Sequence, residues 1–226
     1  MLIRKSYRYF KNLSLYGQLD PTEFFFNDTL GVVYVVNAKV ACSSLKTAIL
    51  EKAPSVDDNY SIHRIKGQSY RGKLNPTHQE YFKFSFVRNP VERLYSCYKS
   101  KFQNDIVKYS RKTPYFDNYL YGYLKNVKSF EEFVDKVIRI SDKYADRHFK
   151  SQTSQLVESK NFELDFVGKI ETIDQDLNVL KDYGIIDLPH FNSSGVEKSN
   201  DFGVVLRNKI IKRYYKDFLN WYPEFL

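Results

Sequence analysis

The sequence has little cysteine, glycine and proline, and no long apolar run. Its two cysteines, Cys42 and Cys97, are too few for a disulfide framework or a thiolate zinc site, and they fit a reducing compartment. With 9 glycines and 7 prolines among 226 residues, the chain is neither collagen-like nor of low complexity. The longest apolar run covers residues 30–36, far short of the roughly 20 residues that a membrane helix needs. We therefore expect a folded protein without a transmembrane segment.

The residues that are abundant are aromatic and basic. Aromatic side chains make up 17% of the chain, so we expect a core built largely from rings. The net charge of +8 favours an anionic partner, but it does not distinguish a nucleic acid, a lipid surface, a glycan or a phosphorylated cofactor. No apolar segment of signal-peptide length follows the basic start, so we expect no secretion signal and a cytoplasmic location.

Strand and helix patterns alternate along the chain. Residues 31–36 form a β-branched apolar run typical of a strand in a parallel sheet, followed by a polar turn at 37–44 and a helix at 45–53. Residues 82–87 form a second strand, after which Asn89 and Pro90 are a typical cap and first residue of a helix. Further elements are a strand within 164–170, helices starting after the capping-box residues Ser129 and Thr172, and one helix over 204–218. The pattern predicts an α/β fold of three layers around a central parallel sheet.

The first strand–loop–helix unit predicts a phosphate site. Its turn delivers backbone N–H groups and the hydroxyls of Ser43 and Ser44 to a helix N-terminus, and Lys39 projects from the loop. The G-x-x-x-x-G-K-[ST] loop of nucleoside triphosphatases is absent, which weakens a triphosphate interpretation. The alternative is an ordinary turn that happens to carry a lysine and two serines.

The second unit predicts another anion receptor. Arg88 stands at the carboxyl end of its strand, where open α/β sheets bind ligands. Ser96 lies eight residues further, on the polar stripe of the helix with Glu92, Arg93 and Lys99, so one phosphate could contact both Arg88 and Ser96. Alternatively, Arg88 forms an ion pair with Glu80 or Glu92. Two receptors at neighbouring strand ends predict a ligand with two separated anionic groups.

These residues carry a resemblance to a known family. Residues 36–46 resemble the 5′-phosphosulfate loop, and residues 84–102 the 3′-phosphate segment, of the carbohydrate sulfotransferases that use 3′-phosphoadenosine 5′-phosphosulfate (PAPS). The resemblance is to sulfotransferase family 2, which includes the chondroitin and HNK-1 sulfotransferases, and it points to a bacterial member. It continues in order through five shorter segments: 129–134, 146–149, 165–172, 188–193 and 215–218. Many relatives have Pro where this chain has Ala38.

The resemblance implies the sulfotransferase fold, with a P-loop-like phosphosulfate loop, and a function. The sulfuryl group of PAPS would move to a carbohydrate hydroxyl, with release of adenosine 3′,5′-bisphosphate (PAP). Lys39 would be both catalytic and cofactor-binding, and Arg88 and Ser96 would bind the 3′-phosphate. The residues that would hold the 5′-phosphosulfate are Ala41, Cys42, Ser43, Ser44 and Leu45. We expect no metal, because a sulfuryl group carries less charge than a terminal phosphoryl group.

An acceptor hydroxyl needs a base, and the chain has four histidines. By resemblance to heparan-type enzymes, His63, which lies between the two cofactor segments, is the preferred catalytic base. His148, in the matched segment 146–149, is the second candidate and could support acceptor binding instead. Either histidine could also be purely structural. We expect His78 to lie at the surface and His190 to orient the loop near Asn192.

The acceptor is the least determined part of the prediction. We expect one sulfotransferase domain over residues 1–226, with an N-terminal extension at 1–30 and acceptor-side insertions at 54–80 and 103–128. The favoured acceptor is a capsular polysaccharide, exopolysaccharide or lipid-linked glycan, and a small alcohol or phenol stays open. A position at the surface of the inner membrane also stays open, and no oligomeric state is predicted. Two rival functions are a P-loop-type kinase and a basic nucleic-acid-binding module, although we expect no nucleic-acid partner.

Overall fold

The computed structural model describes residues 2–50, 62, 67–104, 114–158, 161–188 and 202–226. The chain forms two compact units, and each is described by itself. Unit 1 comprises Met1–Arg88 and Gln152–Ser193, and unit 2 comprises Asn89–Ser151 and Ser194–Leu226. His63 and His190 lie outside the described residues.

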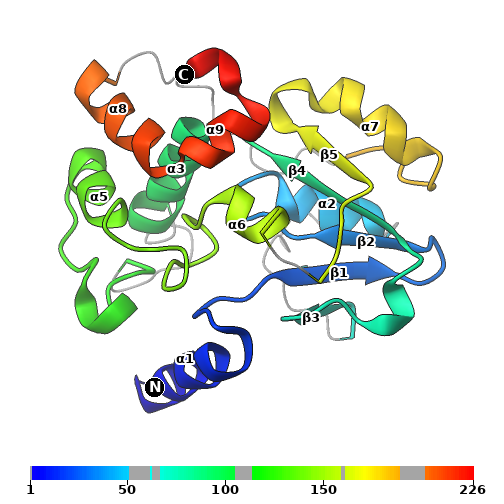
Figure 1. Cartoon of the computed structure of the whole chain (residues 1–226), viewed down its shortest axis with the longest axis horizontal. Coiled ribbons are helices and arrows are strands. Elements are labelled where there is room, and N and C mark those ends of the chain that lie inside the picture. The colour runs from blue at the N-terminus through cyan, green and yellow to red at the C-terminus, as the bar shows by residue number, and fades with distance from the viewer. Residues whose placement is uncertain (1, 51–61, 63–66, 105–113, 159–160, 189–201) are drawn as a thin grey trace. The chain divides into compact units, whose positions relative to one another are not determined.

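Unit 1 contains a five-stranded sheet in the order β3-β1-β2-β4-β5 (Figure 1). The strands are β1 (Glu23–Asn27), β2 (Val32–Val35), β3 (Ser69–Arg71), β4 (Phe82–Val87) and β5 (Phe166–Lys169). β2, β4 and β5 are parallel, whereas β1 is antiparallel to both β2 and β3. The predicted α/β class is confirmed. The sheet is mixed, however, because only four residues separate β1 from β2, and so short a connection makes an antiparallel hairpin.

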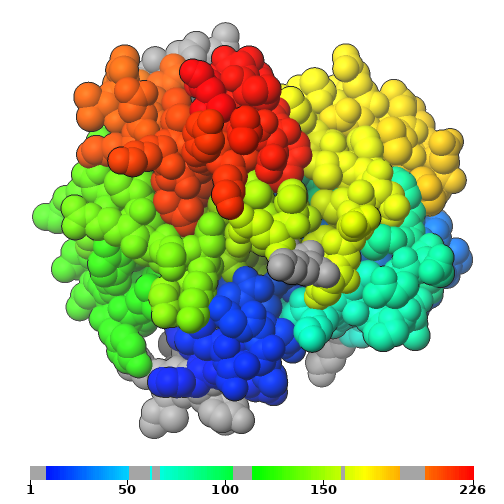
Figure 2. Space-filling model, in the orientation of Figure 1, coloured from blue at the N-terminus to red at the C-terminus, as the bar shows by residue number. Residues whose placement is uncertain are grey.

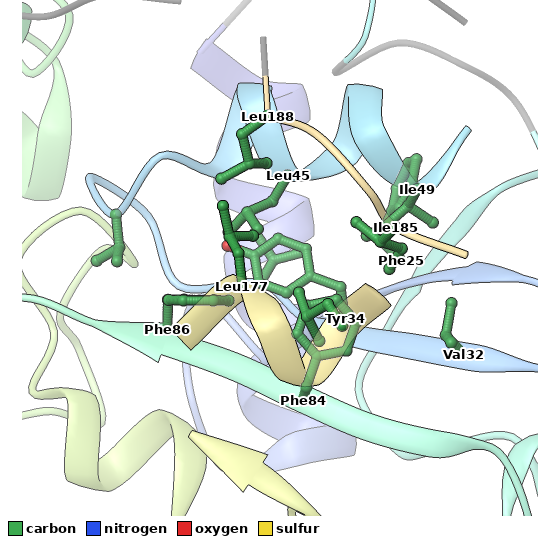
Figure 3. Close-up of a cluster of buried hydrophobic side chains, with 13 residues drawn as sticks. Phe25, Val32, Tyr34, Leu45, Ile49, Phe84, Phe86, Leu177, Ile185 and Leu188 are labelled. Carbon is green, nitrogen blue, oxygen red and sulfur yellow. The ribbon is translucent and has the colours of Figure 1, made fainter. Parts of the chain in front are cut away.

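Helices α2 (Cys42–Ile49) and α7 (Ile173–Lys181) supply the core over one face of this sheet. Leu45 and Ile49 of α2 and Leu177 of α7 lie in one buried cluster with the rings of the central strands (Figure 3). The rings of Tyr34 and Phe84, on β2 and β4, stack with centroids 5.5 Å apart. All four residues of β2 are fully buried, which explains its continuous β-branched and aromatic sequence. The core therefore fixes the two strands that lead to the predicted anion receptors.

Unit 2 is mainly helical and has an aromatic core. Its helices are α3 (Pro90–Tyr98), α5 (Phe130–Val137), α8 (Val204–Arg213) and α9 (Tyr215–Trp221). The expected helix over 204–218 is divided into α8 and α9 because Tyr214 leaves helical geometry, with φ −110° and ψ 27°. The Tyr214 hydroxyl donates a 2.6 Å hydrogen bond to the carbonyl of Phe149, which holds this break in place. Figure 2 shows the outer sides of α8 and α9 next to each other, in orange to red.

Of the three helix caps that the sequence predicts, two are present. Asn89 caps α3, accepting at 3.0 Å from the amide of Val91, and Ser129 caps α5, accepting at 3.2 Å from the amide of Glu132. The predicted capping box at Thr172 is wrong: its hydroxyl donates to Asp176, and it makes no cap for α7. A 3₁₀ turn at Ile170–Thr172 leads directly into α7 and removes the extended geometry that a cap residue needs.

The remaining elements are short, apart from the first helix. They are α1 (Leu2–Tyr16), α6 (Gln152–Leu156), the 3₁₀ helices Pro76–His78, Tyr119–Gly122, Ile170–Thr172 and Pro223–Phe225, and a π-helical segment Lys99–Asn104. Within the described part of the chain, no helix is both long and apolar enough to span a bilayer.

Candidate anion-binding and catalytic site

The loop from β2 into α2 has a backbone that few non-glycine residues adopt. Lys39 and Ala41 have positive φ angles of 71° and 45°, in the left-handed region. Helix α2 starts at Cys42, three residues earlier than the sequence predicts, and Ala41 provides no side-chain cap. The side chain of Ala41 therefore does not cap this turn, and helix N-termini are typical places for anions to bind.

The predicted loop residues fall in this first turn. Ser43 and Ser44 are the second and third residues of α2, with Ser43 half-buried and Ser44 almost fully buried. Lys39 is half-buried and lies two residues before the cap position. Ala41 and Leu45 are joined by the first intrahelical hydrogen bond, 3.0 Å from the Leu45 amide to the Ala41 carbonyl. The sequence from Ala41 to Leu45 therefore forms one turn around the helix N-terminus.

Arg88 lies at the same edge of the sheet. It directly follows β4, which is the parallel neighbour of β2, with Tyr34 paired to Phe84. Parallel strands that are neighbours end at one edge of their sheet. Strands β2 and β4 are neighbours within unit 1 (Figure 1). Lys39 and Arg88 follow the carboxyl ends of these two strands in the sequence.

A buried amide network ties these two strand ends together. Nδ2 of Asn37 donates to the carbonyl of Phe86 and to Oε1 of Gln152, both at 2.9 Å. Gln152 also accepts from the amide of Arg88 at 3.0 Å and donates to the carbonyl of Arg88 at 2.8 Å. Sequence reasoning missed Gln152, because it lies 64 residues after Arg88 and no local spacing connects them. Its only sequence signal is its position just after segment 146–149.

The second lysine of segment 36–46 has a structural role. Nζ of Lys46 lies 2.5 Å from Oε1 of Glu23 on β1, and both side chains are at most 10% exposed. The other carboxylate oxygen of Glu23 accepts from Arg71 at 3.1 Å. Lys46 is therefore held in a buried ion-pair cluster and has a structural role.

Unit 2 contains two further predicted site residues, Ser96 and His148. Ser96 lies on α3 and is half-buried, and its joint contact with Arg88 stays a prediction. Arg93 does not belong to an exposed polar stripe as expected, because it is 2% exposed. Its guanidinium donates to the carbonyls of Lys150 and Arg147, both at 2.7 Å, and burial lowers its pKa. Arg93 thereby fixes the backbone on both sides of His148.

His148 is part of an ordered histidine–carboxylate pair. Its Nδ1 lies 2.5 Å from Oδ1 of Asp146, and its backbone amide donates to the same oxygen at 3.0 Å. The ring meets the rings of Tyr115 and Phe116 edge-on, at centroid distances of 5.6 and 6.0 Å. With Nδ1 committed to the carboxylate, Nε2 is the ring nitrogen suited to accept a proton.

The other histidines contribute less. His63 and His190 were named by sequence reasoning and cannot be placed within the described residues. His78 is not at the surface as expected: it is 4% exposed, its Nδ1 is 2.9 Å from the Tyr70 hydroxyl, and its ring stacks on Tyr81. Aromatic neighbours cover it, which its polar sequence surroundings did not reveal.

Cys42 and Cys97 form no disulfide, as expected, and Cys97 is buried whereas Cys42 is partly buried. Among the described residues, no group of three or more His, Cys, Asp or Glu side chains is arranged to hold a metal ion.

These features define an α/β protein with a left-handed loop before α2 and an arginine after β4, at the ends of neighbouring strands. Residues 22–223 match the Sulfotransferase family, and this chain belongs to that family. It is 29% identical over 170 residues to carbohydrate sulfotransferase 14 of Danio rerio, an alignment covering 68% of this chain and 46% of the relative. It is 26% identical to carbohydrate sulfotransferase 12 of Mus musculus, covering 88% of this chain and 59% of the relative. The chain thus spans about half the length of these relatives. No solved structure matches it significantly.

Proposed function

We propose that this sulfotransferase moves the sulfuryl group of PAPS to a hydroxyl of a carbohydrate acceptor and releases PAP. The observation that supports this most directly is the placement of Lys39 and Arg88 at the carboxyl ends of adjacent parallel strands. A nucleotide with a 5′-phosphosulfate and a 3′-phosphate carries two separated anions, which suits two cationic receptors at one sheet edge.

The donor set of the loop fits a phosphosulfate group. The uncapped first turn of α2 offers amides, and the hydroxyls of Ser43 and Ser44 lie in that turn, with Lys39 just before it. We assign Ala41 to Leu45 to the 5′-phosphosulfate, and Arg88 with Ser96 to the 3′-phosphate. Bound PAPS would supply the sulfuryl group as the electrophile. The Lys39 ammonium would stabilise negative charge that develops on the leaving phosphate oxygens.

Deprotonation of the acceptor needs a base, and the geometry favours His148. Asp146 holds Nδ1 of His148, so the opposite nitrogen, Nε2, can take the hydroxyl proton while the carboxylate stabilises the resulting imidazolium. His63 remains the alternative base on the family resemblance.

The acceptor proposal rests on unit 2 and on the relatives. Tyr115 is 37% exposed, lies against His148, and carries Nζ of Lys101 at 4.5 Å from its ring centroid. An exposed ring can stack on a sugar, and a cation beside the ring can attract the carboxylate or sulfate groups of that sugar. Both relatives named above are called carbohydrate sulfotransferases. We therefore propose an acidic glycan, such as a capsular polysaccharide or exopolysaccharide, with a small alcohol or phenol as the alternative.

Thermal-shift titration of the full chain tests the donor. PAP alone should raise the melting temperature in a concentration-dependent way, since a ligand that binds only the native state stabilises it. Stabilisation by ADP with Mg²⁺ but not by PAP would favour a kinase, and stabilisation by an oligonucleotide alone would favour a nucleic-acid-binding module. Transfer of labelled sulfate from PAPS to a panel of polysaccharides, small alcohols and phenols then identifies the acceptor class.

A further inference from the structure

We infer that Gln152, acting with Asn37, is a positioning residue that holds the two anion receptors of unit 1 at a fixed spacing. This inference rests on the proposed PAPS function and adds a residue outside both predicted cofactor segments. It is carried by hydrogen bonds of the described residues alone, all within unit 1.

The carboxamide of Gln152 pairs with Arg88 as a neighbouring strand would. Its Oε1 accepts from the Arg88 amide at 3.0 Å, and its Nε2 donates to the Arg88 carbonyl at 2.8 Å. Both main-chain polar groups of Arg88 are thus bound by one side chain. This fixes the backbone from which the Arg88 guanidinium extends, at the point where β4 has ended.

The same carboxamide reaches the other strand through Asn37. Oε1 of Gln152 accepts from Nδ2 of Asn37, which stands two residues before Lys39. The hydroxyl of Ser85 adds a further link between these strands by donating to the carbonyl of Val35 at 2.8 Å. Side chains therefore continue the connection of β2 and β4 beyond their last ladder pair, Tyr34 with Phe84.

Burial makes this network stiff. Gln152 and Asn37 are both fully buried, and hydrogen bonds in such surroundings are stronger than in water. Oδ1 of Asn37 is buried and has no hydrogen-bond partner among the described residues. Leaving this acceptor unsatisfied costs free energy. The Asn37 side chain nevertheless keeps this orientation because its Nδ2 donates to two acceptors, the carbonyl of Phe86 and Oε1 of Gln152.

A fixed spacing matters for a ligand that engages both receptors. Once one phosphate group is bound, the second binds as an intramolecular event whose strength depends on how well the receptor spacing is held. A ligand with a single phosphate gains nothing from that spacing. Loss of Gln152 should therefore weaken PAP selectively, and leave AMP and adenosine 3′-monophosphate little changed.

Isothermal titration calorimetry of the 226-residue chain with PAP, AMP and adenosine 3′-monophosphate tests the inference. In Gln152→Met, which keeps length and removes the polar contacts, we expect PAP affinity to fall about tenfold or more, and each monophosphate affinity to change less than about threefold. Gln155→Met is the matched control, because Gln155 lies on the same helix and is 4% exposed. If Gln152→Met does not fold, Asn37→Ala tests the other half of the bridge and should show the same selectivity.

The possible failures can be told apart. If the wild-type protein does not bind PAP, the proposed function fails and the inference fails with it. If the wild type binds PAP and Gln152→Met binds it equally well, only the positioning role is overturned. Equal losses for PAP and both monophosphates, or an equal loss in Gln155→Met, would show general damage to the fold and would likewise overturn it.

Discussion

Lys39 and Arg88 are both cationic, but the structure places them differently enough to expect different effects on substitution. Lys39 lies in the strained loop before α2, where the phosphosulfate group would react, whereas Arg88 follows β4 and would only bind. Lys39→Met should lower kcat by about 10²–10³-fold, as expected for loss of a group that stabilises transition-state charge, with a smaller effect on PAP binding. Arg88→Ala should weaken PAP binding by roughly 10–100-fold, the range for a lost charge-assisted hydrogen bond.

Steady-state kinetics and titration with PAP separate these two effects. Lys46→Met is a control, since Lys46 is engaged by Glu23 in the interior and should affect stability while PAP affinity is retained. If Lys39→Met weakened PAP binding and left kcat unchanged, while Arg88→Ala did the opposite, the two assigned roles would be reversed.

Asp146 is expected to act on the reaction through His148. Asp146→Asn removes the carboxylate that holds Nδ1 of His148, so kcat should fall by about 10²–10⁴-fold, the usual contribution of a positioned general base. PAP affinity should stay within about threefold of wild type, because no cofactor contact is assigned to this pair.

Histidine variants identify the base. His148→Asn should lose activity to the same extent as Asp146→Asn, and the double variant should lose little more, since the two residues act as one unit. Full activity in His148→Asn together with an inactive His63→Asn would assign the base to His63.

At the scale of elements, the end of α8 is held by contacts that are distant in sequence. Asp142 accepts from Arg213, the last residue of α8, at 2.6 Å and from the hydroxyl of Ser151 at 2.7 Å. Burial by itself would raise the pKa of Asp142. The hydrogen bonds from Arg213 and Ser151, together with the positive charge of Arg213, outweigh burial, so the pKa lies below its usual 3.8. The ion pair thus joins α8 to the segment that carries His148.

This pair predicts an acid-dependent loss of stability. A carboxylate whose pKa is lower in the folded state stabilises the fold above its unfolded pKa, and this contribution disappears as the pH falls through the folded value. Asp142→Asn should lower the free energy of unfolding at pH 7 by about 1–2 kcal/mol, the order expected for lost hydrogen bonds to a charged group that is partly exposed. The difference from wild type should shrink progressively below about pH 4.

Urea unfolding across this pH range measures the effect. Asp135→Asn is a matched control, because Asp135 pairs with Lys209 at 2.6 Å with both side chains at least 40% exposed. Such an exposed pair contributes about 0–1 kcal/mol. A deficit in Asp142→Asn that stayed constant down to pH 3 would contradict the assignment of the acid-sensitive stability to this carboxylate.

At the scale of the whole molecule, the net charge of +8 should help to attract an anionic nucleotide. Salt screens such attraction, with a Debye length of about 10 Å at 0.1 M. PAP affinity should therefore fall by about tenfold between roughly 0.05 and 0.5 M NaCl, and less steeply in Arg88→Ala.

Lys181→Gln controls for net charge alone. It removes one positive charge at the last residue of α7, in an exposed position, and should keep the salt dependence of the wild type. Equal slopes for wild type and Arg88→Ala, measured by titration, would show that Arg88 does not interact directly with a phosphate of PAP.

The sequence by itself determined the parts of the fold that depend on neighbouring residues. β4 occupies the predicted residues 82–87, and Asn89 with Pro90 starts α3 as expected. These features could be predicted because apolar periodicity, β-branching and capping act within a few residues. For the same reason the positions of the loop after β2 and of Arg88 after β4 could be predicted, and their role as anion receptors stays a prediction.

The tertiary structure alone decided which polar groups are buried and with what they pair. Gln152 meets Arg88 across 64 residues, Glu23 meets Lys46 across 23, and Arg93 lies inside where its helix pattern placed it outside. Such pairings depend on the folded chain bringing distant segments together, and each buried polar group must then find a partner in whatever surrounds it. Local spacing contains no record of that partner, which is why the role of Gln152 emerged only from the fold.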